Sequence, residues 1–296
     1  MEKYLLASIA GVVGGTIGRY YMLRSDYRQY PSYPHGVVTH MSLGLIAALL
    51  GAVAIPALAE REFTAVTFLA LAATQFRDIR EIERKTLANI DRSELVARGP
   101  DYVEGIARVF ESRNYLVILI AIICSGFTYY GGIEMALVAS IPAILICNRL
   151  MRGKQVGQIA RVRPGEIRFE GVNLYVEDIH FMNLGTRKAR HRVMDRGLGV
   201  IIEPLDDNAR ETLANLGQRK AIAHEVACQL GVYRDVDTAE FMPIVRRNMD
   251  TGRIGLVILP IEKDLGCLLK AVKRVPVLES ALSKPLQSPA GSGAAD

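Results

Sequence analysis

The residues best suited to chemistry are the triplet Asp250, Thr251 and Gly252. Alternating sequence on both sides predicts a β-hairpin formed by residues 241–247 and 253–261, with the triplet in its turn. A carboxylate held in such a turn can share a proton with a second carboxylate and activate a water molecule. The glycine permits the tight turn, and the threonine hydroxyl can orient the acid. The pattern therefore indicates possible hydrolytic chemistry at Asp250.

Asp-Thr-Gly is also the signature triplet of aspartic proteases, in which two such aspartates act together. Because this chain has one triplet, the protease hypothesis requires a homodimer, with Asp250 as the catalytic carboxylate and Thr251 and Gly252 as its supports. The same residues are equally typical of a plain hairpin turn. The preceding residues 246–249 are more polar than the strand that usually delivers a catalytic aspartate. Both interpretations remain open at this point.

A second group of candidates is the set of carboxylates Asp78, Asp101 and Glu104, in a charged segment spanning residues 76–114. Paired carboxylates can divide acid and base roles when their surroundings separate their pKa values. This segment contains similar numbers of acidic and basic residues, which favours solvated ion pairs on exposed helix faces. We therefore rank Asp78 and Asp101 as secondary candidates.

Metal and nucleic-acid sites are weakly indicated. His224 and Cys228, four residues apart on a predicted helix, could share a metal ion, but a third ligand is not evident. We expect no metal and no cofactor. The basic segment 186–196 is predicted to be a loop, and it lacks interleaved aromatic residues. This pattern favours contact with anionic lipid or a protein partner over nucleic acid.

Two halves of different composition must position these residues. The chain has 296 residues, half of them hydrophobic, and nearly all its long apolar runs precede Met151. The expected organisation is a helical membrane domain over residues 1–151, an α+β cytosolic domain over 152–283 and a disordered tail over 284–296. The membrane domain includes the segment 76–114 as a cytosolic loop. Its five predicted spans are residues 5–22, 36–58, 63–74, 115–130 and 135–151.

Charge sets the expected orientation. Lysine and arginine alternate from loop to loop, which places the N-terminus outside the cell membrane and the C-terminal domain in the cytosol. Four unclustered cysteines agree with a reducing compartment, and a net charge of +5 is too small to indicate nucleic acid. The predicted spans carry almost no buried charge, which disfavours a transporter.

The charged segment contains a recognisable motif. Residues 76–90 have apolar side chains at helical spacing, which predicts an amphipathic helix, and the break at Gly99-Pro100 lets Asp101 cap the next helix. That helix opens with the residues Tyr102, Val103, Glu104, Gly105, Ile106 and Ala107.

These residues, with their flanks 98–100 and 110–115, resemble the signature of the YIEGIA family, integral membrane proteins of endospore-forming bacteria. Val103 stands where the family name has isoleucine. The resemblance implies a role in sporulation but no established chemistry. The layout of spans followed by a domain with one Asp-Thr-Gly triplet is similar to that of a spore-former membrane protease that processes a sporulation sigma factor.

Two functions follow as hypotheses. The first is a membrane-tethered aspartic-type endopeptidase that cleaves a cytosolic protein as a homodimer. The second is a non-enzymatic membrane scaffold or regulator that binds a protein partner through the charged segment and the cytosolic domain. The lipid bilayer is an expected partner of both, and nucleic acid of neither.

Overall fold

The computed structural model describes residues 2–26, 34–150, 153–235, 238–239 and 241–293. The chain divides into two units. The first comprises Met1–Lys85 and Ile106–Arg152, and the second comprises Thr86–Gly105 and Gly153–Asp296. Part of the charged segment, which the sequence placed in the membrane domain, therefore belongs to the second unit.

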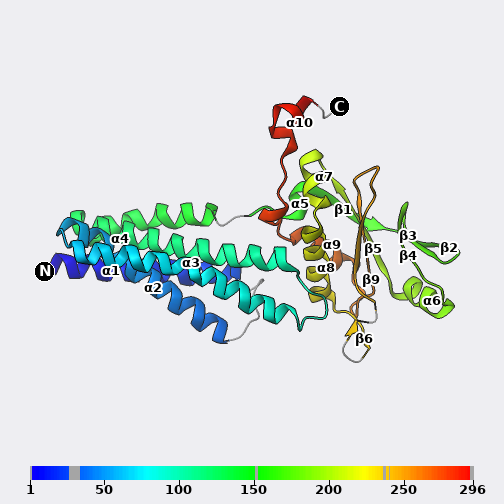
Figure 1. Cartoon of the computed structure of the whole chain (residues 1–296), viewed down its shortest axis with the longest axis horizontal. Helices are drawn as coiled ribbons and strands as arrows, with labels where there is room; N and C mark the ends of the chain where they lie inside the picture. Colours follow the sequence, from blue (N-terminus) through cyan, green and yellow to red (C-terminus); the bar gives the residue numbers. More distant parts are fainter. Residues whose placement is uncertain (1, 27–33, 151–152, 236–237, 240, 294–296) are drawn as a thin grey trace. The chain divides into compact units, whose positions relative to one another are not determined.

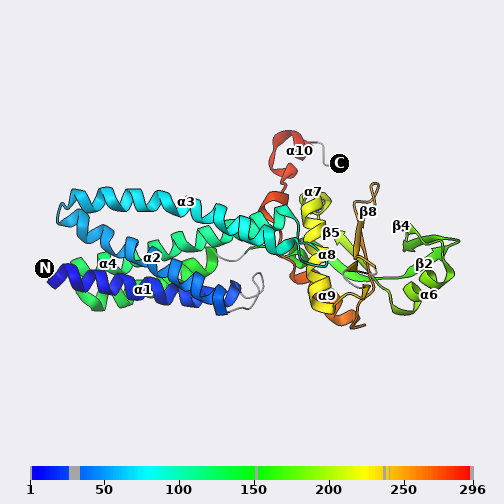
Figure 2. The same ribbon diagram turned by 60° about the horizontal axis from the view of Figure 1, so that its bottom comes forward.

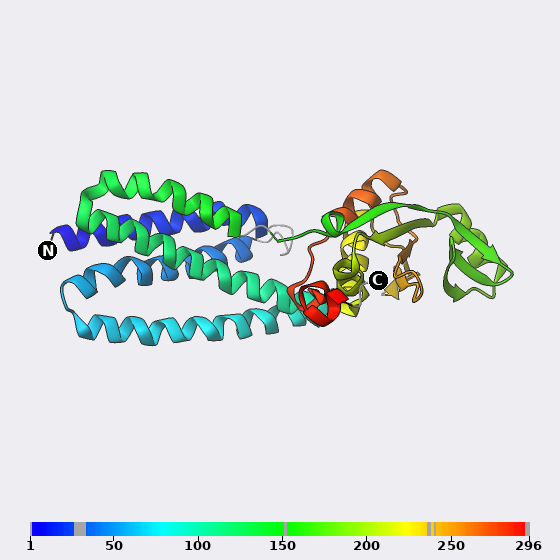
Figure 3. The ribbon, with the colours of Figure 1, turned by 90° about the horizontal axis from the view of Figure 1, so that it is seen from above.

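Four long helices build the first unit and lead out of it: α1 (Glu2–Asp26), α2 (Pro34–Ala59), α3 (Phe63–Asp91) and α4 (Pro100–Leu150). Inside α4 the backbone of Gly132 is non-helical, with φ 82° and ψ 174°. A positive φ of this size is accessible to glycine at little steric cost. The helix therefore turns back there, and its two arms run side by side in opposite directions (Figures 1 and 3).

The expectation of five spans is not supported. Among the described residues, two helices are long and apolar enough to cross a membrane: Gly36–Ala59 and Pro100–Cys147, the second containing the break at Gly132. Phe63–Ala72 is a shorter apolar stretch. It continues without interruption into the predicted amphipathic helix, so that both form one helix, α3 (Figure 2). The reason is that neither glycine nor proline occurs between Phe63 and Asp91 to end the helix.

Glycines allow the helices of the first unit to pack closely. A Cβ added at Gly15 of α1 would lie 2.7 Å from the Cβ of Ala48 in α2. One added at Gly51 of α2 would lie 2.4 Å from the carbonyl oxygen of Ile118 in α4. Both distances are too short for real carbon atoms, so only glycine permits these contacts. Small residues at such spacing are typical of helix pairs in membranes.

The second unit is organised around a four-stranded antiparallel sheet with the strand order β1-β5-β9-β8. Its central strands are fully apolar at their middles: Val200, Ile201 and Ile202 of β5 and Leu256 of β9 are completely buried. The strands are β1 (Ala160–Gly165), β5 (Leu198–Pro204), β8 (Ile244–Arg247) and β9 (Ile254–Ile258).

Helices cover one side of this sheet, and a smaller sheet lies on the other (Figure 1). An antiparallel sheet with its helices on one face is the arrangement of an α+β domain, as predicted. The helices are α5 (Val156–Ile159), α7 (Asp207–Ala214), α8 (Leu216–Leu230) and α9 (Leu265–Arg274). The smaller sheet consists of β2 (Ile167–Glu170), β3 (Asn173–Val176) and β4 (Ile179–Asn183), followed by α6 (Arg187–Arg196). A short pair, β6 (Arg234–Asp235) and β7 (Thr238–Ala239), completes the strands of the described residues.

The basic segment 186–196 is the helix α6 and not a loop, because the hydroxyl of Thr186 accepts a hydrogen bond from the amide of Ala189 at 3.3 Å and caps the first turn. The predicted helix that holds His224 and Cys228 is α8, which starts at Leu216 because the side chain of Asn215 accepts a hydrogen bond from the amide of Gln218.

The tail expected to be disordered from residue 284 contains the short helices η2 (Pro285–Gln287) and α10 (Pro289–Gly293), which follow η1 (Glu279–Ala281). The amide of Leu286 donates to the side-chain oxygen of Asn208 at 3.1 Å. This contact gives the tail a partner in α7 that its composition did not reveal. Residues 294–296 lie outside the described residues.

Candidate functional site

Residues 91–105, which we call the coupling segment, lie along α8 within the second unit. The carboxylate of Asp91 accepts hydrogen bonds from the amides of Arg98, at 2.7 Å, and Gly99, at 3.1 Å. Gly99 has a φ of +87°, which turns the chain so that α4 begins at Pro100. Asp91 and Gly99 thus fix the direction in which the following side chains approach α8.

His224 of α8 is buried and lies between two groups of the coupling segment. Its Nδ1 is 2.6 Å from the carbonyl oxygen of Val96, and its Nε2 accepts from Nε of Arg98 at 3.0 Å. A carbonyl can only accept and a guanidinium can only donate. The proton of His224 must therefore be on Nδ1, and the ring must be neutral.

The surroundings of His224 favour this neutral form. Burial lowers the pKa of His224 below its ordinary value, and the positive charge of Arg98 lowers it further, although the hydrogen bond to Val96 acts in the opposite direction. The thiol of Cys228 lies 3.4 Å from Nε2. Burial is the main cause that raises the pKa of Cys228 to about 11, and the negative charges of Glu94 and Glu225 contribute to the increase. This thiol is therefore protonated at neutral pH and is poorly suited to metal binding.

The described residues contain no group of three or more histidine, cysteine or acidic side chains that could hold a metal ion. His224 and Cys228, the pair considered from the sequence, are therefore neighbours, but the described residues supply no third side chain that could complete a metal site with them. Both ring nitrogens of His224 already have hydrogen-bonding partners. The pair is best explained as part of the attachment of the coupling segment.

Tyr102 provides a second buried contact. Its hydroxyl donates to the carboxylate of Glu225 in α8, and both side chains are buried. The edge of its ring also faces His224, with the ring centres 6.2 Å apart. Removing a buried partner from a carboxylate costs more than the hydrogen bond itself, because the charge is left poorly solvated. Tyr102, the first residue of the signature, is therefore a principal anchor.

Asp101 and Gly105 also lie close to residues of the second unit. A Cβ added at Gly217, in the first turn of α8, would lie 2.2 Å from Oδ2 of Asp101. A carboxylate near the amino end of a helix is favoured by the helix dipole. Because α4 already begins at Pro100, Asp101 lies in its first turn and is not its cap as predicted. A Cβ added at Gly105 would lie 3.8 Å from Leu278, which is an ordinary contact.

The remaining signature residues continue along α4. Val103, Ile106 and Ala107 are buried, and Glu104 is half-buried. The chain passes from the second unit to the first between Gly105 and Ile106. The signature is therefore the place in the sequence where α4 leaves the α+β domain.

The Asp-Thr-Gly triplet forms the turn between β8 and β9. The side-chain oxygen of Asn248 accepts from the amides of Asp250, at 2.9 Å, and Thr251, at 3.1 Å, and Gly252 has a φ of +69°. Asparagine that binds the amides following it is a common device of turns. These contacts explain the triplet as a hairpin turn without any catalytic requirement.

Ion pairs and hydrogen bonds hold this turn in place. The carboxylate of Asp178 accepts from Arg253 and from the side chain of Asn248, both at 2.8 Å. Asp250 and Thr251 are exposed. Within the part of the chain that the structure describes, the carboxylate of Asp250 makes no hydrogen bond or ion pair. Thr251 and Arg253 line a cleft of about 440 Å³, together with residues of β5 and α7.

The candidate carboxylates are therefore not a single group. Asp101 lies against the start of α8, whereas the turn that holds Asp250 lies beside Arg210 of α7, the neighbour of Gly252. Asp78 is exposed on α3 in the first unit. Among the residues that the structure describes, none of the three contacts a second group that would complete an acid–base pair.

Sequence reasoning missed a polar cluster in the first unit. Arg19 is completely buried in α1; its guanidinium contacts Nδ1 of His40 at 2.6 Å and lies over the ring of Phe110. Arg113 is buried too; it lies in the segment 76–114, outside the predicted spans, whereas Arg19 lies inside the span predicted over residues 5–22. A Cβ added at Gly44 of α2 would lie 2.4 Å from Cγ of Arg19, so glycine leaves the space that this side chain occupies; no local pattern in the sequence connects the two residues.

We predict that Gly217→Ala destabilises the second unit and Gly105→Ala does not. The first substitution must displace Asp101 and should lower the free energy of unfolding by about 1–3 kcal/mol, as overpacking does. The second adds an ordinary contact in a helix. Hydrogen exchange of residues 91–105 measures both, with faster exchange expected only in Gly217→Ala. Equal exchange in the two variants would contradict the packing described.

The stability of the second unit should also depend on pH through His224. Since the folded pKa lies below the ordinary value of 6.5, the unfolded chain binds the proton first as the pH falls. The stabilisation is complete above that value and declines below it. Denaturant unfolding at a series of pH values measures the slope, which His224→Gln should reduce. The exposed His191→Gln is the control, and an equal reduction in that variant would refute the assignment.

Comparison with known proteins agrees with the signature. The sequence model described as "YIEGIA protein" matches residues 7–288. The "Uncharacterized protein YphB" of Bacillus subtilis (strain 168) is 43% identical over 287 residues, which are 97% of this chain and 97% of that protein. No solved structure matches significantly. The chain therefore belongs to the YIEGIA family.

Proposed function

We propose that this protein is a non-enzymatic, membrane-associated regulator that acts in sporulation by binding a cytosolic protein partner. One observation carries the proposal: the coupling segment is hydrogen-bonded to α8 and continues directly into the apolar helix α4. A displacement of α4 would change the geometry of these hydrogen bonds and so affect the α+β domain. A partner bound to the α+β domain would, through the same hydrogen bonds, change the position of α4. Coupling of this kind is reciprocal.

The chemistry of the coupling segment supports a structural role. His224, which binds the segment, is neutral, and both of its ring nitrogens are hydrogen-bonded. The neighbouring thiol of Cys228 is protonated, and the hydroxyl of Tyr102 donates to the carboxylate of Glu225. An activated nucleophile needs a base with an available lone pair or a lowered pKa. The groups here are instead committed to holding two segments together.

Membrane insertion in the cell membrane is part of the proposal. The two apolar helices support it by length and composition. The distribution of lysine and arginine supports an outside N-terminus and a cytosolic α+β domain. Arg19 is buried in α1 and therefore does not count among the basic residues of the first connection in this argument. The family resemblance supports the role in sporulation.

The substitution Tyr102→Phe tests the proposal that the protein is a regulator. The substitution removes one hydroxyl and leaves Glu225 with one partner fewer, which should cost about 1–3 kcal/mol. We expect normal protein levels in the membrane, faster hydrogen exchange of the coupling segment and fewer heat-resistant spores. Tyr175→Phe, in β3, is the matched control. Full spore yield from a Tyr102→Phe strain with a demonstrably loosened segment would reject the regulator.

An aspartic-type protease is the second candidate. The observation in its favour is that Asp250 is exposed at the hairpin tip, with Thr251 lining the adjacent cleft. In a homodimer two such tips could approach each other across a twofold axis, and the two carboxylates would then share a proton. The cleft would accept a segment of a cytosolic protein substrate.

Asp250→Asn separates this candidate from the regulator, because asparagine is as suitable as aspartate in a turn but cannot share the catalytic proton. The protease predicts loss of a specific cleavage product in sporulating cells at unchanged protein level. Asp207→Asn, which removes a negative charge from the same cleft, is the control and should retain cleavage. If the Asp250→Asn strain forms spores and cleavage products normally, the protease is excluded.

A further inference from the structure

Strand β8 has a free edge. It is the last strand of the four-stranded sheet, and no strand of the described residues pairs with its other side. The amide of Asn248 donates to the carbonyl oxygen of Arg253 at 2.8 Å, and Arg247 lies opposite Ile254. Hydrogen-bonded and non-hydrogen-bonded pairs alternate along an antiparallel ladder. The backbone amides and carbonyls of Val245 and Arg247 therefore point away from β9, toward the free edge.

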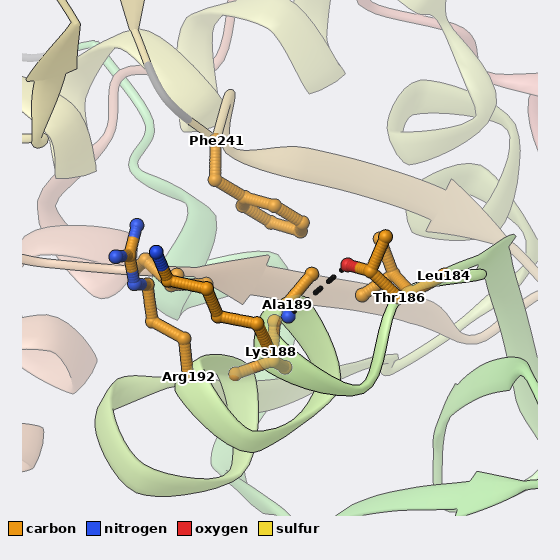
Figure 4. Close-up of a pocket in the computed structure, with 8 residues that line it drawn as sticks. Leu184, Thr186, Lys188, Ala189, Arg192 and Phe241 are labelled. Atoms are coloured by element: carbon orange, nitrogen blue, oxygen red, sulfur yellow. Dashed lines mark hydrogen bonds between the residues drawn. The ribbon is translucent and has the colours of Figure 1, made fainter.

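Contacts at both ends hold β8 in its extended form. Before the strand, the ring of Phe241 extends toward α6 and lines a cavity of about 230 Å³ with residues of that helix (Figure 4). Phe241 and Ile244 pack against the core cluster that contains Val257 of β9. After the strand, the side chain of Asn248 donates to Asp178 at 2.8 Å. A strand that is already ordered loses little conformational entropy when a ligand binds to it.

Arginine side chains flank this edge on both faces of the sheet. Nη2 of Arg247 lies 3.6 Å from Oε1 of Glu211 in α7, so Arg247 is on the face that the helices cover. Arg246 is opposite Gly255 in the ladder, and directly opposite residues share a face. A Cβ added at Gly255 would lie 2.7 Å from Cζ of Phe181 in β4, so Arg246 is on the face of the smaller sheet. A strand added at this edge would therefore meet a positive charge on each face.

A third arginine, Arg219 of α8, adds to this positive charge. Burial lowers the pKa of Arg219 below its ordinary value, and the charges of Arg247 and Arg246 lower it further. The Nε groups of Arg219 and Arg247 are buried, and neither has a hydrogen-bonding partner among the described residues. Glu211 pairs with Arg247, but at a distance longer than a hydrogen bond. The three guanidinium groups therefore carry more positive charge than the described residues around them compensate.

We propose that an acidic, extended segment of a protein partner binds β8 as an additional strand, with its carboxylates at Arg219, Arg246 and Arg247. Backbone hydrogen bonds join the segment to Val245 and Arg247, as in other cases of strand addition. Because successive side chains of a strand point to opposite faces, two adjacent acidic residues reach both faces at once. The inference rests on the proposed regulator and specifies the chemistry of its partner.

The opposite edge strand of the same sheet, β1, differs in both respects. Pro164 has no amide hydrogen to donate. The guanidinium of Arg163 is bound to the carboxylates of Glu177 and Glu203, the latter at 2.8 Å. Its charge is therefore compensated within the domain. Charge on an edge strand opposes pairing between identical chains, and at β8 the uncompensated charge also selects a segment of opposite sign.

Isothermal titration calorimetry of the full chain in micelles of a neutral detergent tests the site. The probe is a hexapeptide with two central glutamates between valines and threonines, and its matched control has glutamine at both central positions. We expect the glutamate peptide to bind at least about tenfold more tightly, because charge-assisted hydrogen bonds are stronger than neutral ones. Equal affinity of the two peptides, or no binding of either at about 1 mM, would overturn the proposal.

N-methylation of the glutamate peptide distinguishes strand addition from attraction of charge alone. In a strand, alternate amides point toward the neighbouring strand. Methylation of one alternate set should weaken binding at least about tenfold, and methylation of the other set should change the affinity less than about twofold. An equal effect of the two sets would mean that charge alone holds the peptide, and strand addition would be rejected.

Substitutions in the protein test the same assignment. Arg246→Gln and Arg247→Gln should each raise the dissociation constant at least about fivefold, whereas Arg161→Gln, at an exposed position of β1, should not. Val245→Pro removes an amide that points away from β9 and should weaken binding about tenfold. Val245→Thr retains that amide and is its control, and equal hydrogen exchange of β9 in the two variants establishes that the sheet is intact. Equal affinity of these two intact variants, or an equal loss in Arg161→Gln, contradicts the proposal.

These measurements are independent of the spore assay. If the peptide does not bind although Tyr102→Phe lowers the spore yield, the regulator is retained and this partner chemistry is rejected. If the peptide binds as expected but the Tyr102→Phe strain forms spores fully, the regulator is rejected and the edge of β8 stands as a peptide-binding site.

Discussion

The second unit depends on one neutral imidazole. His224 donates to the backbone of Val96 and accepts from the side chain of Arg98, so it joins residues separated by 126 and 128 positions in the sequence. Only the neutral ring with its proton on Nδ1 can form both hydrogen bonds. The Tyr102–Glu225 hydrogen bond lies one residue further along α8, and the close approach of Asp101 to Gly217 lies at its start. These contacts together position the first turn of α4.

The elements of the α+β domain were largely predictable, whereas their contacts were not. Alternation and turn residues located the β8–β9 hairpin, because these signals are local. The helix α6 was missed since its composition is strongly charged and its cap is a single threonine. The five predicted spans are not supported as such, because the short apolar start of α3 and its polar continuation form one helix.

The candidate site was predictable only in part. The signature marked the correct region, but its role depends on His224 and Glu225, which are distant in sequence and carried no local pattern linking them to Tyr102. Asp101 was assigned to a cap because a break at Gly99-Pro100 suggested one, whereas Asp91 supplies the hydrogen bonds of that turn. The buried position of Arg19 also depends on a distant residue, Gly44.

The division of the chain has a consequence for its synthesis. Residues 86–105 belong to the second unit, but they leave the ribosome before α8 has been made. The domain therefore cannot fold from its C-terminal residues alone as they are synthesised. It must also bind residues 86–105, which were synthesised earlier, at the entropic cost of closing a long loop. A truncated protein that begins at Gly153 would lack that piece and expose the buried side of α8, even though its own sequence appears to be a complete domain.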